Sequence, residues 1–86
     1  MTHRATEQFW RRYWDLPKEV RDLSDISFKH MKANHRHPSL KFKKVGDFWS
    51  ARVGAAFRVL AIEDGDDYIW VWIGSHDDYM KIIRNR

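Results

Sequence analysis

The first third of the chain repeats its hydrophobic residues with the period of an α-helix. Four aromatic side chains fall at i, i+1, i+4 and i+5: Phe9, Trp10, Tyr13 and Trp14. This spacing predicts one face of a short helix whose aromatic side chains pack into the core. A second helix is predicted from about Pro17 to Ala33, because proline suits a first helical turn and apolar residues recur at roughly helical spacing. It is expected to end near Asn34, before Pro38.

Beyond this point the period of the pattern changes to two, which is typical of β-strands. Four strands are predicted over residues 40–45, 48–54, 56–63 and 68–75, joined by short turns that contain Gly54 and Gly65. The last strand is apolar on both faces, which indicates a central position, and period-two alternation places Trp70 and Trp72 on one face. Residues 77–85 predict a short terminal helix or tail.

This order of elements predicts one α+β domain over residues 1–86. A helical hairpin is expected to pack on one face of a four-stranded, mainly antiparallel sheet. If the apolar strand residues face the helices, basic residues gather on the open face: Lys41, Lys43 and Arg52. Arg58 follows a hairpin turn and could approach them. Such a surface would position phosphates, although ordinary solvent-exposed residues on a sheet face would give the same pattern.

Composition narrows the class of protein. The 86 residues include no cysteine, which excludes a disulfide scaffold and a thiolate zinc site. There is no apolar run of about 20 residues and no apolar leader, so a cytoplasmic protein without a membrane partner is expected. The formal net charge is +4, with basic residues concentrated in 41–58 and acidic residues in 63–78. This separation of charge favours an anionic partner for one part of the surface.

The segment "GSHDDY" is the strongest candidate for catalytic chemistry. Histidine can exchange protons near neutral pH, and a nearby tyrosine hydroxyl can bind a phosphate, which makes His76 and Tyr79 the candidates. Gly74 ends the strand and lets a ligand approach the backbone. The alternative is that Asp77 or Asp78 caps the last helix, while the tyrosine packs and the histidine faces solvent.

No metal and no cofactor are expected. His30, His35 and His37 lie close together in the sequence but lack the regular spacing of metal ligands. The chain has no glycine-rich phosphate loop and no serine nucleophile elbow. Phosphate-loop nucleotide hydrolysis and serine hydrolysis are therefore not expected.

Four segments, in order, resemble the RelE/ParE superfamily of toxins from bacterial type II toxin–antitoxin systems. They are "LPKEVRDL", "HPSLKFKKV", "WSARVGAAFRVLAI" and "WIGSHDDY", and the resemblance covers roughly residues 8–83. It implies a helical hairpin on a small antiparallel sheet. For the RelE-like branch it also implies metal-independent cleavage of mRNA, usually in the ribosomal A site, by attack of a 2′-hydroxyl on its own 3′-phosphate. The implied partners are mRNA, the ribosome and a cognate antitoxin protein.

The same resemblance implies roles for individual residues. Arg58 matches the arginine that stabilises the phosphate, and Arg52 matches a basic position on the preceding strand. His76 matches a position commonly assigned acid duty, and Tyr79 corresponds to a C-terminal tyrosine. The residues expected to grip the RNA backbone are Lys41, Lys43 and Lys44.

Two departures from the family pattern leave other functions open. Asp77 and Asp78 stand where a further basic residue often occurs, and the C-terminal tail is short. One alternative is a ParE-like toxin that inhibits DNA gyrase and is not a nuclease. The other is a catalytically inactive member of the fold that only binds a partner.

Overall fold

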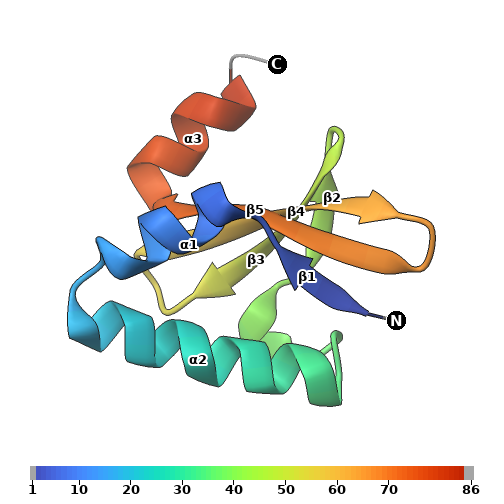
Figure 1. The fold of residues 1–86 in the computed structure, drawn as a ribbon, viewed down its shortest axis with the longest axis horizontal. Helices are drawn as coiled ribbons and strands as arrows, with labels where there is room; N and C mark the ends of the chain where they lie inside the picture. The colour runs from blue at the N-terminus through green and yellow to red at the C-terminus, as the bar shows by residue number, and fades with distance from the viewer. Residues whose placement is uncertain (1, 85–86) are drawn as a thin grey trace.

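The computed structural model describes residues 2–84 as a five-stranded sheet with helices on both faces (Figure 1). The helices are α1 (Glu7–Trp14), α2 (Lys18–Ala33), the short 3₁₀ helix η1 (Pro38–Leu40) and α3 (His76–Arg84). The strands are β1 (His3–Ala5), β2 (Lys43–Val45), β3 (Phe48–Val53), β4 (Phe57–Asp64) and β5 (Asp67–Ser75). No helix of this part of the chain has the length and apolar character needed to cross a membrane.

The α+β class, the two N-terminal helices and the C-terminal helix are confirmed, but the prediction of four strands is wrong. The sheet order is β1-β5-β4-β3-β2, with β1 parallel to β5 and all other neighbours antiparallel. The additional strand, β1, has only three residues, too few to show alternation. The predicted last element is α3, and residue 85 of that prediction lies outside the described residues.

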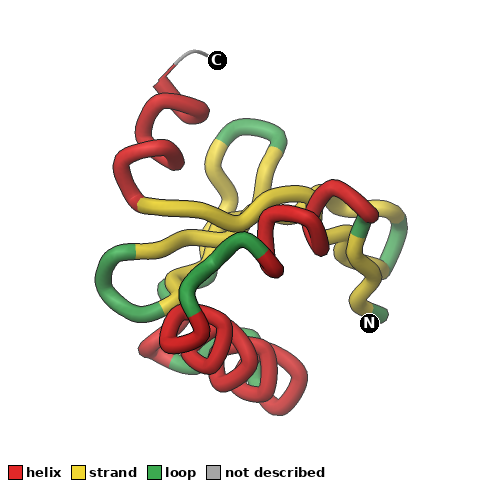
Figure 2. The backbone as a smooth tube through the Cα atoms, turned by 60° about the vertical axis from the view of Figure 1, so that its left-hand side comes forward, coloured by secondary structure: helices red, strands yellow, loops and turns green. Residues whose placement is uncertain are grey.

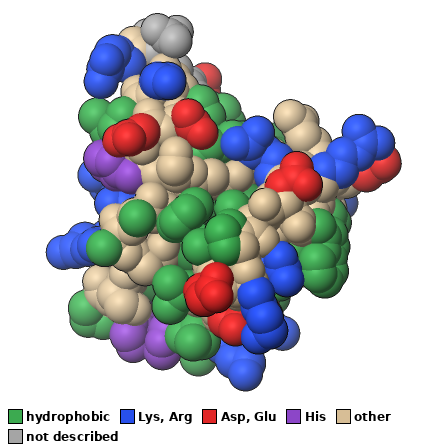
Figure 3. All heavy atoms as spheres, turned by 90° about the vertical axis from the view of Figure 1, so that its left-hand side faces the viewer, with side chains coloured by type: hydrophobic (Ala, Val, Ile, Leu, Met, Phe, Trp, Pro, Cys, Tyr) green, Lys and Arg blue, Asp and Glu red, His purple; other side chains and the backbone are tan. Residues whose placement is uncertain are grey.

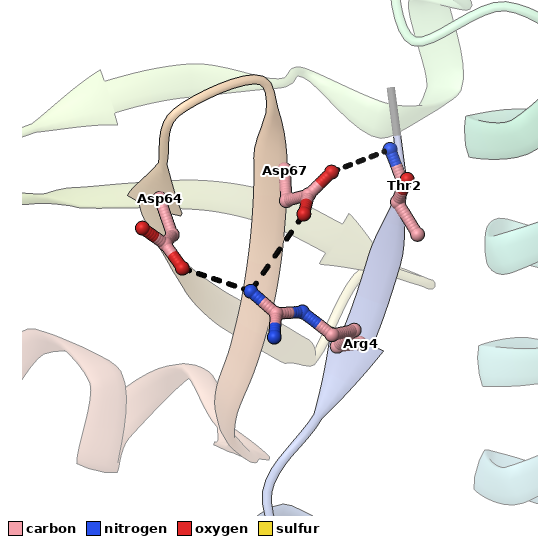
Figure 4. Close-up of polar contacts among 4 residues, drawn as sticks. All are labelled: Thr2, Arg4, Asp64 and Asp67. Atoms are coloured by element: carbon pink, nitrogen blue, oxygen red, sulfur yellow. Dashed lines mark hydrogen bonds and ion pairs between the residues drawn. The ribbon is translucent and has the colours of Figure 1, made fainter.

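Polar contacts with Asp64 and Asp67 help to hold strand β1 to the sheet (Figure 4). Arg4 contacts Asp64 at 2.8 Å and Asp67 at 3.7 Å, and the backbone nitrogen of Thr2 donates to Asp67 at 3.2 Å. Asp64 and Asp67 flank the turn between β4 and β5. Part of the acidic charge of residues 63–78 therefore serves to fix this strand in place.

The sheet separates two hydrophobic clusters, with α2 on one side and α3 on the other (Figures 1 and 2). The cluster on the side of α2 contains Trp70, Val59 and Ala51, together with residues of α1 and α2. The cluster under α3 contains Leu60, Trp72 and Tyr79. This second cluster means that the sheet face opposite α2 is partly covered.

A β-bulge decides which tryptophan belongs to which cluster. Leu60 pairs with Trp72 and Ala61 pairs with Trp70, so Val71 is an extra residue in β5. The extra residue reverses the alternation, and the two tryptophans lie on opposite faces. The prediction that they share a face is wrong, because strict period-two counting does not allow for a bulge.

The two N-terminal helices lean on different parts of the sheet. Helix α1 contacts β5, whereas α2 contacts β3 and η1. Tyr13 joins them by donating its hydroxyl to Asp25 at 2.8 Å. Between them lies a mainly apolar hollow of about 290 Å³. Trp10 and Trp14 are 46% and 66% exposed, so only half of the aromatic face predicted for the core is buried.

Candidate active site

The strongest feature of the open sheet face is a pair of arginines directly opposite each other. The antiparallel register of β3 and β4 pairs Arg52 with Arg58, next to the hairpin turn. Residues paired in this way point to the same side of the sheet, with Cβ atoms roughly 4.5–5.5 Å apart. Ser50 and Leu60 form the next pair on this face, and Leu60 belongs to the cluster under α3.

Within the described part of the chain, neither arginine has a carboxylate partner. None of the ion pairs formed within residues 2–84 involves Arg52 or Arg58. The Nε atom of Arg52 is buried and has no hydrogen-bond partner in the described chain. Arg58 donates Nη1 to the backbone oxygens of Ala55 at 3.2 Å and Phe57 at 2.7 Å. Burial, followed by the charge of Arg52, lowers the pKa of Arg58, which is the response of a crowded cation without a counterion.

Helix α3 brings His76 and Tyr79 to the same place. The helix begins directly after β5, and the backbone nitrogen of His76 donates to Ala56 in the hairpin turn at 2.8 Å. The two rings lie 6.0 Å apart between centroids. Tyr79 is 4% exposed, and its interaction with Arg58 acts against the lowering of that arginine's pKa. The structure therefore brings together Arg52, Arg58, His76 and Tyr79.

The three lysines expected to grip RNA do not stay together. Lys43 pairs with Ser50 and so lies on the face of Arg52. Lys44 pairs with Trp49 on the opposite face, and its ammonium lies 3.9 Å from Glu63. Lys41 lies outside the strands, in a left-handed conformation (φ 46°) after η1. The strand predicted from residue 40 begins only at residue 43, because Pro38 starts a 3₁₀ turn there instead.

The acidic residues after His76 belong to the first turn of α3. Ser75, not an aspartate, caps this helix by accepting a hydrogen bond from the backbone nitrogen of Asp78 at 3.1 Å. Asp78 also lies 4.0 Å from Lys81, and Asp77 is exposed. Figure 3 views this end of the molecule, where acidic, basic and histidine side chains lie close to one another. The candidate site is therefore a mixed-charge surface, with its two central arginines on the sheet.

Arg12 is a further member of this surface that the sequence analysis missed. It belongs to α1, yet its Nε donates to the backbone oxygen of Ile73 at 2.9 Å and its guanidinium lies 5.0 Å from the centre of the Trp72 ring. The sequence shows only two consecutive arginines, and Arg11 forms an ordinary helical ion pair with Glu7. Nothing in the pattern distinguishes the two, because the position of Trp72 depends on the bulge.

The described residues contain no group of three or more side chains able to hold a metal ion. His30 and His37 stack with ring centroids 3.9 Å apart, far along the chain from His76. Arginine side chains can stabilise an anion, and histidine and tyrosine side chains can transfer protons.

Comparison with solved structures identifies the fold. Over 92% of this chain and 96% of the other, the structure matches the toxin–antitoxin complex RelB–RelE from Methanococcus jannaschii with a TM-score of 0.72 and 16% identity. The YoeB/ParE toxin from Agrobacterium tumefaciens matches with a TM-score of 0.66 and 16% identity, over 88% and 99% of the chains. The chain has the RelE toxin fold.

The isolated RelE toxin of Escherichia coli covers still more of the chain, 98% of it and 96% of its own length, with a TM-score of 0.63 and 11% identity. The sequence matches no protein-family model and no curated protein. At these identities the RelE fold is established and the chemistry is not. The fold implied by the four resembling segments is thus confirmed.

Proposed function

We propose that this chain is the toxin of a type II toxin–antitoxin system and cleaves mRNA on the ribosome. The observation that carries the proposal is the cross-strand pair Arg52–Arg58, which has no carboxylate partner among the described residues and lies beside His76 and Tyr79. Arg52 and Arg58 are each partly buried, and two neighbouring cations in such a place are costly unless an anion joins them. An RNA phosphate supplies that anion.

The proposed reaction is an internal transfer within RNA. The 2′-oxygen forms a bond to the adjacent phosphorus, and the bond from phosphorus to the 5′-oxygen breaks, leaving a cyclic phosphate and a 5′-hydroxyl. Arg52 and Arg58 stabilise the negative charge that grows on the phosphate oxygens. The 2′-hydroxyl proton passes to water, and His76 gives a proton to the departing 5′-oxygen. Tyr79 positions Arg58 from beneath.

A cognate antitoxin is the proposed protein partner. The M. jannaschii, E. coli and Mycobacterium tuberculosis structures of this fold are complexes of toxin with antitoxin. An acidic or helical antitoxin segment would cover the basic face or displace α3, whose apolar side packs on Leu60 and Trp72. Either event would block access to the paired arginines.

Expression in bacterial cells with mapping of RNA 5′ ends tests the proposal. The wild-type chain is expected to stop growth and to produce new 5′ ends within translated mRNA. Arg58→Gln is expected to lower cleavage by roughly 10²–10³-fold, the scale of losing one preorganised charge stabiliser. His76→Ala is expected to abolish cleavage with an unchanged melting temperature. Arg11→Gln, an exposed substitution on α1, is the matched control and keeps full activity.

Two outcomes would favour the other functions. Growth arrest with intact RNA and impaired DNA supercoiling would support a gyrase inhibitor. Normal growth with no change in RNA or supercoiling would support a chain that only binds a partner. Unchanged cleavage by His76→Ala would remove this histidine from the mechanism.

A further inference from the structure

Arg12 is held more firmly than a surface arginine needs to be. Its guanidinium carbon lies over the Trp72 ring, 5.0 Å from the ring centre, and its Nε donates to the Ile73 backbone oxygen at 2.9 Å. The pairing between β1 and β5 ends at Trp70, so this oxygen belongs to a part of β5 that β1 does not reach. The cation–π contact and the hydrogen bond together restrict the guanidinium before any ligand arrives.

The terminal nitrogens of Arg12 have no hydrogen-bond or ion-pair partner among the described residues. Within residues 2–84, no ion pair or hydrogen bond involves its Nη1 or Nη2 atoms. A guanidinium carries five N–H donors, of which the Nε–H is the one used here. Up to four donors therefore remain for an anion, and Arg12 is only half-buried.

Gly74 shows where these donors lie relative to the candidate active site. It pairs directly with Arg58, so a Cβ at this position would point to the same face as the arginine. That Cβ would lie 2.5 Å from Cζ2 of Trp72 and 3.1 Å from Nη2 of Arg12. The space above Gly74 is thus filled by the Trp72 ring and the Arg12 guanidinium. Arg52, Arg58 and Arg12 follow one another across β3, β4 and β5.

We propose that Arg12 binds the RNA phosphate next to the one held by Arg52 and Arg58. This rests on the proposed function and deepens it, because it fixes the path of the strand across the sheet toward β5 and α1. An RNA strand presents phosphates at regular intervals, and a row of guanidinium groups matches such a ligand better than it matches a single small anion. The Trp72 ring and the Ile73 oxygen hold the guanidinium beside Gly74, on the face that carries Arg58.

The test uses a short single-stranded RNA with 2′-O-methyl sugars, which lacks the attacking hydroxyl and cannot be cleaved. Its dissociation constant is measured at several salt concentrations for the wild-type chain, Arg12→Gln, Arg12→Lys and Arg11→Gln. Arg12→Gln is expected to weaken binding roughly tenfold, the scale of a lost charge-assisted contact. It should also reduce the slope of log K against log salt by about 0.7, the value for one phosphate on a single strand.

The two other variants distinguish a specific phosphate contact from a general effect of charge or of structure. Arg12→Lys keeps the charge but not the planar fork, so the salt slope is expected to return while only part of the affinity does. Arg11→Gln removes the same charge from the neighbouring position and should change affinity less than twofold. An Arg12→Gln variant that melts earlier but binds with wild-type affinity and slope would show a purely structural residue and overturn the proposal. Absence of any RNA binding by the wild-type chain would also overturn it.

The outcome for Arg12 is distinguishable from the outcome for catalysis. If the wild-type chain cleaves no RNA in cells but shows the Arg12-dependent salt slope, the nuclease function fails and the RNA contact stands. If the wild-type chain cleaves RNA and Arg12→Gln binds and cleaves equally well, the nuclease function stands and the Arg12 contact fails.

Discussion

The position of Arg52 costs the folded protein stability. A side chain selected for stability alone would not be an arginine here. Its Nε is buried without a partner in the described part of the chain, and another guanidinium lies directly across the sheet. A buried unsatisfied donor costs about 1–3 kcal/mol, and opposed like charges add to this cost. Such a cost at an intact fold is typical of a residue retained for function.

Replacement of Arg52 by methionine is therefore expected to leave stability unchanged or to raise the free energy of unfolding by about 1 kcal/mol. The apolar chain keeps most of the volume and removes the unsatisfied donor. Cleavage of mRNA is expected to fall at least tenfold. Urea unfolding and mapping of RNA ends measure the two effects. A loss of more than about 2 kcal/mol of stability would show that Arg52 has a structural role.

The residue scale also shows what the sequence could and could not predict about the site. Arg52, Arg58, His76 and Tyr79 were named from local segments and a resemblance, and the fold brings these four together. Their proposed roles stay predictions. Lys41 was misplaced because a proline-initiated turn replaced the start of a strand. Such a turn is a local event that alternation alone does not reveal.

At the scale of elements, β1 and the bulge in β5 are the features that sequence patterns missed. A three-residue parallel strand has no period of its own and forms because β5 offers a free edge. The bulge depends on the pairing of β4 with β5, so it appears only when both strands are in register. Longer elements, such as α2 and β4, show a periodic pattern in the sequence and are predicted within a few residues of their bounds.

His3 makes the attachment of β1 sensitive to acid. Its Nδ1 accepts a hydrogen bond from Nε1 of Trp70 at 3.2 Å, and its ring stacks on Trp70. Burial, with nearby positive charges, lowers the pKa of His3 below its ordinary value. The unfolded chain therefore binds a proton at higher pH than the folded chain does. Stability from His3 is full above about pH 6.5 and is lost as pH falls through the lowered pKa.

A His3→Gln variant tests this attachment. Glutamine can still accept from the tryptophan but does not titrate. The wild-type chain is expected to lose more free energy of unfolding between pH 7.5 and pH 5 than the variant does, because only the wild-type side chain takes up a proton more readily when unfolded. Urea titrations at the two pH values measure it. Equal losses in both chains would show that His3 does not couple β1 to pH.

At the scale of the whole molecule, the sheet separates two kinds of surface. The hollow between α1 and α2 is mainly apolar, and Trp10, Ile26 and Phe28 are exposed on these helices. The opposite face carries the arginines and is bordered by α3. The bulge in β5 shapes both surfaces, because it places Trp70 on the side of α1 and α2 and Trp72 on the side of α3. A single bulge thus lets β5 supply one tryptophan to the core on each face of the sheet.

The formal net charge of +4 does not by itself determine how strongly RNA would bind near the candidate active site. Asp77 and Asp78 stabilise the start of α3 through the helix dipole, by about 0.3–1 kcal/mol each, yet they stand beside His76. The same charges that secure the helix carrying His76 and Tyr79 repel the proposed substrate. The position of each acidic residue should therefore affect RNA binding more than the total net charge does.

Two single substitutions distinguish the effect of where an acidic residue lies from the effect of the total net charge. Asp77→Asn and Asp66→Asn each raise the formal net charge from +4 to +5, but Asp66 lies in the turn between β4 and β5, at the other end of β5 from His76. Asp77→Asn is expected to strengthen binding of the uncleavable RNA about two- to fivefold at low salt, with the gain fading at high salt. It should also lower the free energy of unfolding by about 0.5 kcal/mol. Asp66→Asn should change RNA binding little. Equal gains from both substitutions would mean that RNA responds to total charge and does not lie beside the start of α3.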